Sequence, residues 1–221
     1  MPAPILYYIT DRRAFSGDER SRQQRLLGKI EEASRAGVDY IQLREKDLSA
    51  RDLEALAREA LSVLRKANLQ NATPERSSAL LINSRTDVAL AIGADGVHLP
   101  ASDLDAEEVR RVWNLSDAGV PRRTKISVSC HGVEEVKQAA AKGVDLAIFA
   151  PVFEKKDAAE ARPAGLDALR RACKAKIPVL ALGGVTLENA SACLGAGAAG
   201  IAGIRLFQEH DMAQIVARLA H

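Results

Sequence analysis

The stretch Ala36-Gly37-Val38-Asp39-Tyr40-Ile41 decides the fold, because its pattern returns three more times along the chain. The other copies are Ile92-Gly93-Ala94-Asp95-Gly96-Val97, Lys142-Gly143-Val144-Asp145-Leu146-Ala147 and Ala196-Gly197-Ala198-Ala199-Gly200-Ile201. Each copy follows a helix-like stretch and opens an apolar run. Glycine suits the residue just after a helix, since it adopts positive φ without a Cβ clash. Each copy therefore predicts a junction from helix to strand.

The spacing of these junctions predicts the number of strands. The glycines stand at positions 37, 93, 143 and 197, so 56, 50 and 54 residues separate them. One strand-and-helix unit of a parallel barrel takes roughly 25–30 residues, about half of that spacing. The repeat therefore marks every second unit and predicts eight strands. The whole chain, residues 1–221, is expected to form a single-domain (β/α)8 TIM barrel.

The apolar segments between the repeats complete this pattern. Strands are expected at 5–10, 38–43, 79–82, 95–99, 125–129, 145–150, 177–182 and 198–203. Helices are expected at 20–36, 50–67, 85–93, 104–118, 132–142, 165–175, 187–196 and 210–220. Short strands that are apolar on both faces are typical of a buried parallel sheet. A doubly wound open sheet also alternates in this way, but eight even units without a GxGxxG turn favour the closed barrel.

Composition and charge exclude several classes of protein. Hydrophobic residues make up 47% and charged residues 27%, which argues against a disordered chain. A net charge of +2 gives no overall basic field, so no nucleic-acid partner is expected. The three cysteines, at 130, 173 and 193, form neither a disulfide framework nor a zinc pattern. No secretory leader or membrane-length apolar stretch is recognised, so a cytoplasmic protein without a membrane partner is expected.

The ends of the expected strands carry the candidate chemistry, because barrel active sites are built there. After the second strand, alternation places Gln42, Arg44 and Lys46 on one side. Two cations and an amide at a barrel mouth suit a phosphorylated substrate. The alternative is a structural ion-pair cluster of these cations with Glu45 and Asp47.

Polar residues also follow the third and fourth strands. Asn83 and Ser84 could hold a turn and cap the next helix. Asp103 could ligate Mg2+ or could instead cap the helix expected at 104–118.

The fifth strand ends in Ser129-Cys130-His131. Ser129 and His131 share a face of the strand, which brings a hydroxyl and a titratable ring together. Cys130 points the other way, so a Cys-His nucleophile pair is disfavoured, and His131 could simply open the next helix.

Glycines follow the last two strands, at Gly183, Gly184 and Gly203, and Arg205 follows them. Their backbone N–H groups could cradle a phosphate, which is a recurrent site of this fold. Turn geometry alone is the alternative. Two further loops stand out: the polar loop 68–78 is expected at the barrel bottom, and the charged stretch 154–164 is a candidate lid at the top.

Together these motifs closely resemble the thiamine phosphate synthase/TenI family, from about Tyr8 to Phe207. The matching segments are Gln42-Leu43-Arg44-Glu45-Lys46, Asn83, Gly93-Ala94-Asp95-Gly96-Val97-His98-Leu99, Ser129-Cys130-His131, Pro151-Val152-Phe153 and Leu182-Gly183-Gly184-Val185-Thr186. For the synthase, the resemblance implies that pyrophosphate leaves hydroxymethylpyrimidine diphosphate with Mg2+ assistance. The nitrogen of a thiazole phosphate then attacks the pyrimidinyl cation and forms thiamine phosphate.

The resemblance also implies residue roles. Gln42 would hold the pyrimidine, Arg44 and Lys46 the pyrophosphate with Asn83 beside them, and Asp103 the Mg2+. Ser129 would contact the reacting groups, with His131 and Lys46 among the catalytic residues. The thiazole phosphate would be seated by Gly183, Gly184 and the segment 203–205, and the lysines Lys155 and Lys156 would help to bind substrate. Partners would be small phosphorylated molecules, with a homo-oligomer left open.

Three departures from the synthase pattern keep other functions open. Ser84 stands where a second metal-binding Asp is expected, the threonines expected near Lys155 and Lys156 are missing, and Arg205 replaces a Ser. Loss of a carboxylate weakens Mg2+ binding. TenI-type proteins resemble the synthase but act as metal-independent thiazole tautomerases, with a catalytic histidine that matches His131. A third hypothesis is a non-catalytic protein that binds phosphorylated ligands.

Overall fold

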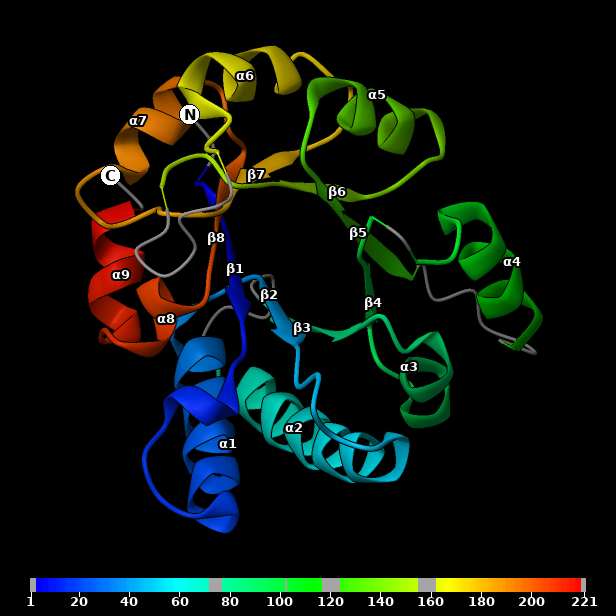
Figure 1. Ribbon diagram of the computed structural model, residues 1–221. Helices are drawn as coiled ribbons and strands as arrows, with labels where there is room; N and C mark the ends of the chain where they lie inside the picture. Colours follow the sequence, from blue (N-terminus) through cyan, green and yellow to red (C-terminus); the bar gives the residue numbers. More distant parts are fainter. Residues whose placement is uncertain (1–2, 72–76, 102, 117–123, 155–161, 220–221) are drawn as a thin grey trace.

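A computed structural model describes residues 3–71, 77–101, 103–116, 124–154 and 162–219. In these ranges, eight parallel strands pair in chain order and close into one barrel, which helices surround (Figure 1). The strands are β1 (Ile5–Ile9), β2 (Tyr40–Leu43), β3 (Ala79–Asn83), β4 (Gly96–Leu99), β5 (Lys125–Cys130), β6 (Leu146–Phe149), β7 (Val179–Ala181) and β8 (Gly200–Gly203). The expected (β/α)8 barrel and the place of every expected strand are confirmed.

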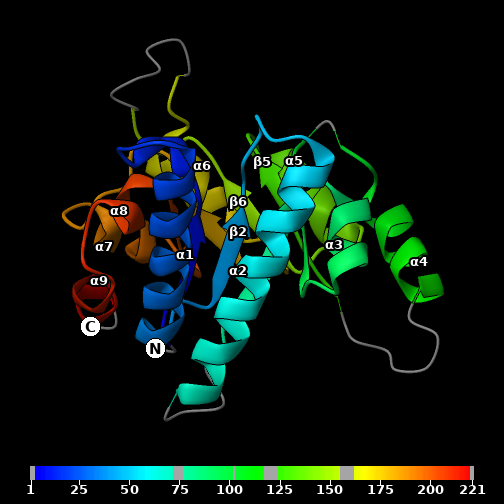
Figure 2. The same ribbon diagram turned by 90° about the horizontal axis from the view of Figure 1, so that it is seen from below.

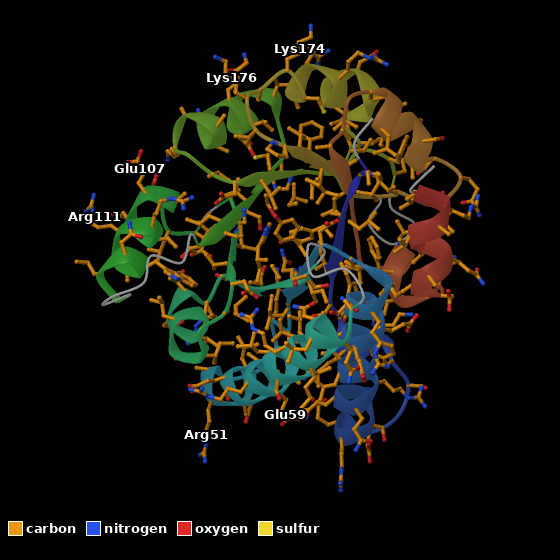
Figure 3. The ribbon with its side chains drawn as sticks, turned by 180° about the vertical axis from the view of Figure 1, so that it is seen from behind. Arg51, Glu59, Glu107, Arg111, Lys174 and Lys176 are labelled. Atoms are coloured by element: carbon orange, nitrogen blue, oxygen red, sulfur yellow. The ribbon has the colours of Figure 1, made fainter. Side chains whose placement is uncertain are left out.

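Helices form the outer layer. They are η1 (Arg12–Ala14), α1 (Glu19–Ala36), α2 (Ala50–Gln70), α3 (Thr86–Ile92), α4 (Ala106–Ser116), α5 (Val133–Ala141), α6 (Gly165–Ala172), α7 (Ala190–Gly195), α8 (Arg205–Gln208) and α9 (Met212–Leu219). Figure 2 shows α1 and α2 side by side along the outer wall of the barrel. Charged side chains on the outer helices, such as Arg51 on α2 and Glu107 on α4, project away from the barrel (Figure 3).

Some expected boundaries are wrong. The loop expected at 68–78 begins later, because α2 continues to Gln70, and residues 72–76 lie outside the described ranges. The helices η1 and α8 were not expected, since three or four residues are too few to show a 3.6-residue period. Of the candidate lid 154–164, residues 155–161 also lie outside the described ranges.

The four repeated glycines all adopt positive φ. Gly37 and Gly93 end α1 and α3 directly, with φ of 88° and 67°. Gly143 and Gly197, with φ of 66° and 98°, lie one residue beyond the caps of α5 and α7. A side chain at any of these positions would strain the backbone, so the sequence signal has the expected physical cause.

The aspartates of the repeat join neighbouring strands at the amino-terminal end of the barrel. The Oδ2 atoms of Asp39, Asp95 and Asp145 each accept a hydrogen bond from a backbone N–H of the preceding strand. The donors are Leu6, Leu80 and Ile126, at 2.8, 2.8 and 3.0 Å. In each case the backbone N–H of the aspartate donates back to the carbonyl of the same donor residue. The fourth copy carries Ala199, which keeps only the backbone bond, to the Val179 carbonyl at 2.8 Å.

The apolar core has two parts, because successive side chains of a strand point to opposite faces. One part fills the barrel, and its buried members are Tyr7, Ile9, Leu81, Leu146, Ile148, Leu180 and Ala202. The larger part lies between the barrel and the helices and includes Tyr8, Leu26, Ile30 and Phe207. This packing fixes the strand ends from which the polar residues below extend.

Candidate active site

The carboxylates that follow β2 are bound by a buried arginine. Arg12, 3% exposed on η1, donates to Glu45 at 3.1 Å and to both Asp47 oxygens at 2.7 and 2.8 Å. Thr10 adds a hydrogen bond to Glu45 at 2.6 Å. The hydrogen bonds from Arg12 lower the pKa of Asp47 to about 2, whereas burial raises the pKa of Glu45 against its hydrogen bonds. These carboxylates thus have partners other than the cations beside them in sequence.

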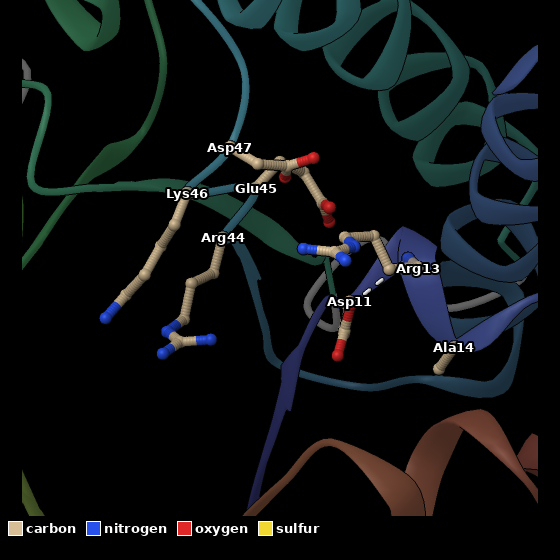
Figure 4. Close-up of a pocket in the computed structure, with 7 residues that line it drawn as sticks. All are labelled: Asp11, Arg13, Ala14, Arg44, Glu45, Lys46 and Asp47. Atoms are coloured by element: carbon tan, nitrogen blue, oxygen red, sulfur yellow. Dashed lines mark hydrogen bonds between the residues drawn. The ribbon is translucent and has the colours of Figure 1, made fainter.

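Arg44 and Lys46 extend from the same segment to the opposite side (Figure 4). Among the described residues, no carboxylate forms an ion pair with either of them, so the expected alternative of a cluster with Glu45 and Asp47 is wrong. They line a pocket of about 450 Å³ at the carboxyl ends of β1 and β2. Its lining residues are Asp11, Arg13, Ala14, Arg44, Glu45, Lys46 and Asp47. Cations at a pocket that have no ion-pair partner among the described residues can attract an anion.

A chain of four hydrogen bonds crosses the barrel interior. Gln42 Nε2 donates to the Tyr7 hydroxyl oxygen at 3.0 Å, and that oxygen lies 2.9 Å from Ser127 Oγ. Ser127 Oγ lies 2.9 Å from His98 Nδ1, and His98 Nε2 lies 2.9 Å from Ser129 Oγ. The chain therefore links two predicted site residues, Gln42 and Ser129.

The His98 ring is neutral in this chain of hydrogen bonds. Burial, followed by the nearby positive charge of Arg44, lowers the pKa of His98 to about 3. Tyr7 and Ser127 were not predicted as site residues, although the alternation of β1 and β5 is a signal that places them in the barrel interior.

Ser84 and Asp103 contact each other. Neither residue caps a helix, so the alternative interpretation of each as a helix cap is wrong. Ser84 Oγ donates to Asp103 Oδ2 at 2.5 Å, and Ser84 has a left-handed backbone with φ of 64°. Arg85 is the residue that precedes α3, and it makes no side-chain cap. For α4, Asp105 accepts the N–H of Glu107 at 2.9 Å. The left-handed backbone of Ser84 is strained, and a role as a helix cap does not account for that strain.

The residues that follow β5 separate. Ser129 bonds His98 in the barrel interior, whereas the His131 ring bonds the Ala150 carbonyl at 2.8 Å and is exposed. The structure therefore does not join Ser129 to His131, and α5 begins at Val133, so His131 does not open it. Cys130 is 1% exposed among apolar side chains, and burial raises its pKa to about 12. A protonated, covered thiol is a poor nucleophile.

Close backbone packing surrounds the glycines that follow β7. Gly183 and Gly184 have φ of 94° and 65°, and a Cβ at Gly184 would lie 2.5 Å from the Glu154 carbonyl oxygen. Gly203 ends β8, and the exposed Arg205 begins the short helix α8. Loops after the seventh and eighth strands, together with a short extra helix, are the usual phosphate site of this fold.

The pocket at Arg44 and Lys46 does not include all the predicted residues. Asn83 ends β3 and pairs in register with His98, but neither it nor Ser129 nor the glycines line the pocket at Arg44 and Lys46. Lys155 and Lys156 lie outside the described residues. None of the described helices is long and apolar enough to cross a membrane.

The closed barrel defines a (β/α)8-barrel protein, with Arg44 and Lys46 lining a pocket at the carboxyl ends of its strands. Residues 6–207 match a family model described as thiamine monophosphate synthase, TMP-TENI. The thiamine-phosphate synthase of Roseiflexus castenholzii is 39% identical over 202 residues, which cover 90% of this chain and 78% of that protein. That of Clostridium novyi is 38% identical over 210 residues, covering 93% and 91%. The solved thiamine phosphate pyrophosphorylase from Pyrococcus furiosus superimposes with a TM-score of 0.75 at 29% identity, covering 97% and 93%. The chain belongs to the thiamine monophosphate synthase family.

Proposed function

We propose that this chain is a thiamine-phosphate synthase, which joins hydroxymethylpyrimidine diphosphate to thiazole phosphate and releases pyrophosphate. The observation that carries the proposal is that Arg44 and Lys46 have no ion-pair partner among the described residues. Their neighbouring carboxylates are bound to Arg12, so both cations are available for a diphosphate. Family membership supports the same reaction.

The reaction needs charge neutralisation and positioning more than a nucleophilic side chain. As the bond between the pyrimidine methylene carbon and oxygen breaks, its electron pair goes to the leaving pyrophosphate, where Arg44 and Lys46, with Asn83 beside them, stabilise the added charge. The thiazole nitrogen then shares its lone pair with the carbon. Gln42 holds the pyrimidine, and Ser129 contacts the reacting groups.

The second substrate is placed on the other side of the barrel mouth. In this proposal its phosphate binds at Gly183, Gly184 and Gly203, with Arg205 adding positive charge. The positive φ of the first two glycines supports a backbone turn at that place. Lys155 and Lys156 are proposed to contact substrate from the segment that follows β6.

The residues present fit a single Mg2+ bound partly by substrate. Among the described residues, no cluster of three His, Cys, Asp or Glu side chains could hold a metal by itself. Mg2+, however, is often held by one or two carboxylates together with substrate phosphates. Asp103 would supply the carboxylate, and the Ser84 hydroxyl beside it a further oxygen. When bound, the ion would neutralise charge on the leaving pyrophosphate.

The test is formation of thiamine phosphate from both substrates with purified protein and Mg2+. The expected result is product and pyrophosphate in equal amounts, abolished by EDTA and restored by Mg2+. Asp103→Asn should raise the Mg2+ concentration needed for half-maximal rate, whereas Asp105→Asn, which alters a helix cap and an ion pair with Lys142, should not. Tight ligand binding without product would instead indicate a non-catalytic binding protein, and activity unaffected by EDTA would exclude the role of Mg2+.

A second candidate function is thiazole tautomerisation, and the geometry of His131 favours it. The Ala150 carbonyl can only accept a hydrogen bond, so His131 Nδ1 carries a hydrogen and Nε2 is the ring nitrogen that remains for a ligand. An exposed ring anchored in this way could move a proton on a thiazole carboxylate phosphate. Isomerisation that is lost in His131→Asn would support this function, and isomerisation retained in that variant would remove His131 as the acid/base.

A further inference from the structure

The hydrogen-bonded chain between Gln42 and Ser129 has a defined direction. Its interior members are almost fully buried: Gln42 is 1% exposed, Tyr7 and Ser127 are 0% exposed, and His98 is 4% exposed. Buried polar groups satisfy their hydrogen bonds within the protein, because water does not reach them. The position of each hydrogen along the chain therefore depends on the position of the one before it.

The direction begins at Gln42. Its amide N–H can only donate, so the Tyr7 oxygen accepts, and the single hydroxyl hydrogen of Tyr7 is left for Ser127. Ser127 then donates its own hydrogen to His98 Nδ1. The ring is neutral, since burial lowers the pKa of His98 to about 3, so its one hydrogen lies on Nε2.

The direction ends at Ser129. His98 Nε2–H donates to Ser129 Oγ, which lies 2.9 Å away. The hydroxyl hydrogen of Ser129 takes no part in the chain and remains for a ligand. Unlike the fully buried Ser127, Ser129 is half-buried, so its hydroxyl has access to the barrel mouth.

We propose that Tyr7, Ser127 and His98 are positioning residues, which hold His98 as the Nε2–H tautomer and leave Ser129 as a hydrogen-bond donor to the substrate. The role in catalysis rests on the proposed synthase function. A hydroxyl whose oxygen already accepts a hydrogen bond directs its hydrogen outward before the reaction begins. Such a donor stabilises negative charge that develops on the leaving pyrophosphate without reorientation at the moment of reaction.

The tautomer can be measured without any ligand. In protein with ¹⁵N-labelled histidine, the long-range ¹H–¹⁵N spectrum distinguishes the protonated ring nitrogen from the bare one, and the spectrum of His98→Gln assigns the signal. We expect His98 to be neutral at pH 7 with its hydrogen on Nε2. A hydrogen on Nδ1 would mean that the chain runs in reverse and would overturn the proposal.

Breaking the chain at Tyr7 supplies the second test. Tyr7→Phe removes the hydroxyl that donates to Ser127, so His98 should populate both tautomers. Tyr8→Phe is the matched control: Tyr8 is equally buried, but its hydroxyl bonds Gln208 outside the chain, so the Nε2–H form should persist. Ser127→Ala breaks the same chain if Tyr7→Phe does not fold. If His98 has the same tautomer in Tyr7→Phe as in Tyr8→Phe, the proposal is overturned.

Kinetics separate positioning from general damage. Complete loss of one preorganised hydrogen-bond donor lowers rates by about 100-fold or more. In Tyr7→Phe the Ser129 hydroxyl is still present but less well oriented, so kcat should fall roughly tenfold, with KM little changed. In a Ser129→Ala background, Tyr7→Phe should have no further effect on kcat, because Tyr7 acts through Ser129. Independent, multiplying effects would contradict this role. If the wild-type protein makes no thiamine phosphate, the proposed function fails. The tautomer measurement alone then decides whether the hydrogen bonds run from Gln42 to Ser129.

Discussion

The two ends of the barrel differ in how their charged side chains are paired. At the amino-terminal end, Asp95 and Asp145 accept backbone N–H groups and also pair with Arg65 and Arg110, at 2.6 and 3.0 Å. At the carboxyl-terminal end, the described residues supply no ion-pair partner to Arg44, although carboxylates lie one residue away and three residues away in sequence.

This contrast separates charged side chains that stabilise the fold from those that are available to a ligand. A charge whose partner belongs to the protein contributes to folding, whereas a cation that the fold leaves without a partner is available to bind an anion. Arg12 creates this second state by forming ion pairs with Glu45 and Asp47, so that neither carboxylate pairs with Arg44. Substitutions at the two ends should therefore have different consequences.

The largest effect is expected at the carboxyl-terminal end. Arg44→Gln removes a charge-assisted contact of about 2–3 kcal/mol, so kcat/KM should fall roughly 100-fold. The free energy of unfolding should change by less than about 0.5 kcal/mol, since Arg44 forms no ion pair with any described residue. Steady-state kinetics and urea unfolding measure the two quantities. The matched control is Arg51→Gln on the exposed face of α2 (Figure 3), which should leave both unchanged. Equal activity of the two variants would contradict a role of Arg44 in binding the substrate.

The reverse pattern is expected at the amino-terminal end. Asp145→Ala leaves the Ile126 N–H and Arg110 without this acceptor, so the free energy of unfolding should fall by about 1–3 kcal/mol. The value of kcat/KM, measured below the melting temperature, should stay within about twofold because the site is at the other end. Asp167→Ala breaks an exposed pair with Arg170 and should cost less than about 0.5 kcal/mol. A large loss of activity in Asp145→Ala would mean that the two ends are coupled.

Acid should destabilise the fold through His98. Its pKa is about 3 in the folded state, below the ordinary value of 6.5, so between these values the unfolded chain binds more protons. Stability is therefore retained above pH 6.5 and is lost as the pH falls, at a slope of up to about 1.4 kcal/mol per pH unit. Urea unfolding at a series of pH values measures the slope. His98→Gln should flatten it, whereas His210→Gln, at an exposed histidine, should not; identical slopes would mean that His98 ionises freely.

The smallest effect is expected at Cys130. The thiol faces the helices rather than the barrel mouth, and burial raises its pKa to about 12. Cys130→Ala should keep kcat within about twofold, and iodoacetamide should leave the wild-type thiol unmodified at pH 7. Mass spectrometry and steady-state rates are the measurements. Inactivation by alkylation of Cys130 would restore the nucleophile hypothesis.

The fold could be predicted because its signals are local. A glycine that ends a helix needs positive φ, and the recurrence of that glycine at 37, 93, 143 and 197 predicts eight strands without any tertiary information. Three copies of the same repeat carry an aspartate, but the sequence pattern does not indicate the role of these aspartates. Their hydrogen bonds run to the preceding strand, so only the closed barrel reveals them.

The site was predicted less completely, because contacts between distant strands decide it. Strand alternation placed Arg44 and Lys46 correctly on one side, but the capture of their neighbours by Arg12 depends on a helix more than 30 residues earlier. Ser84 and Asp103 each resembled a helix cap in sequence. In the structure they bond each other across 19 residues, which no local pattern predicts.

The most direct measurement is calorimetric titration of the purified protein with inorganic pyrophosphate, with and without Mg2+. Uncompensated cations at the barrel mouth predict binding that weakens as salt is added and tightens with Mg2+. Arg44→Gln should weaken this binding at least tenfold, and Asp145→Ala should leave it unchanged. No binding to the wild-type protein, or equal weakening in both variants, would contradict the division of the barrel into an end that serves folding and an end that serves the ligand.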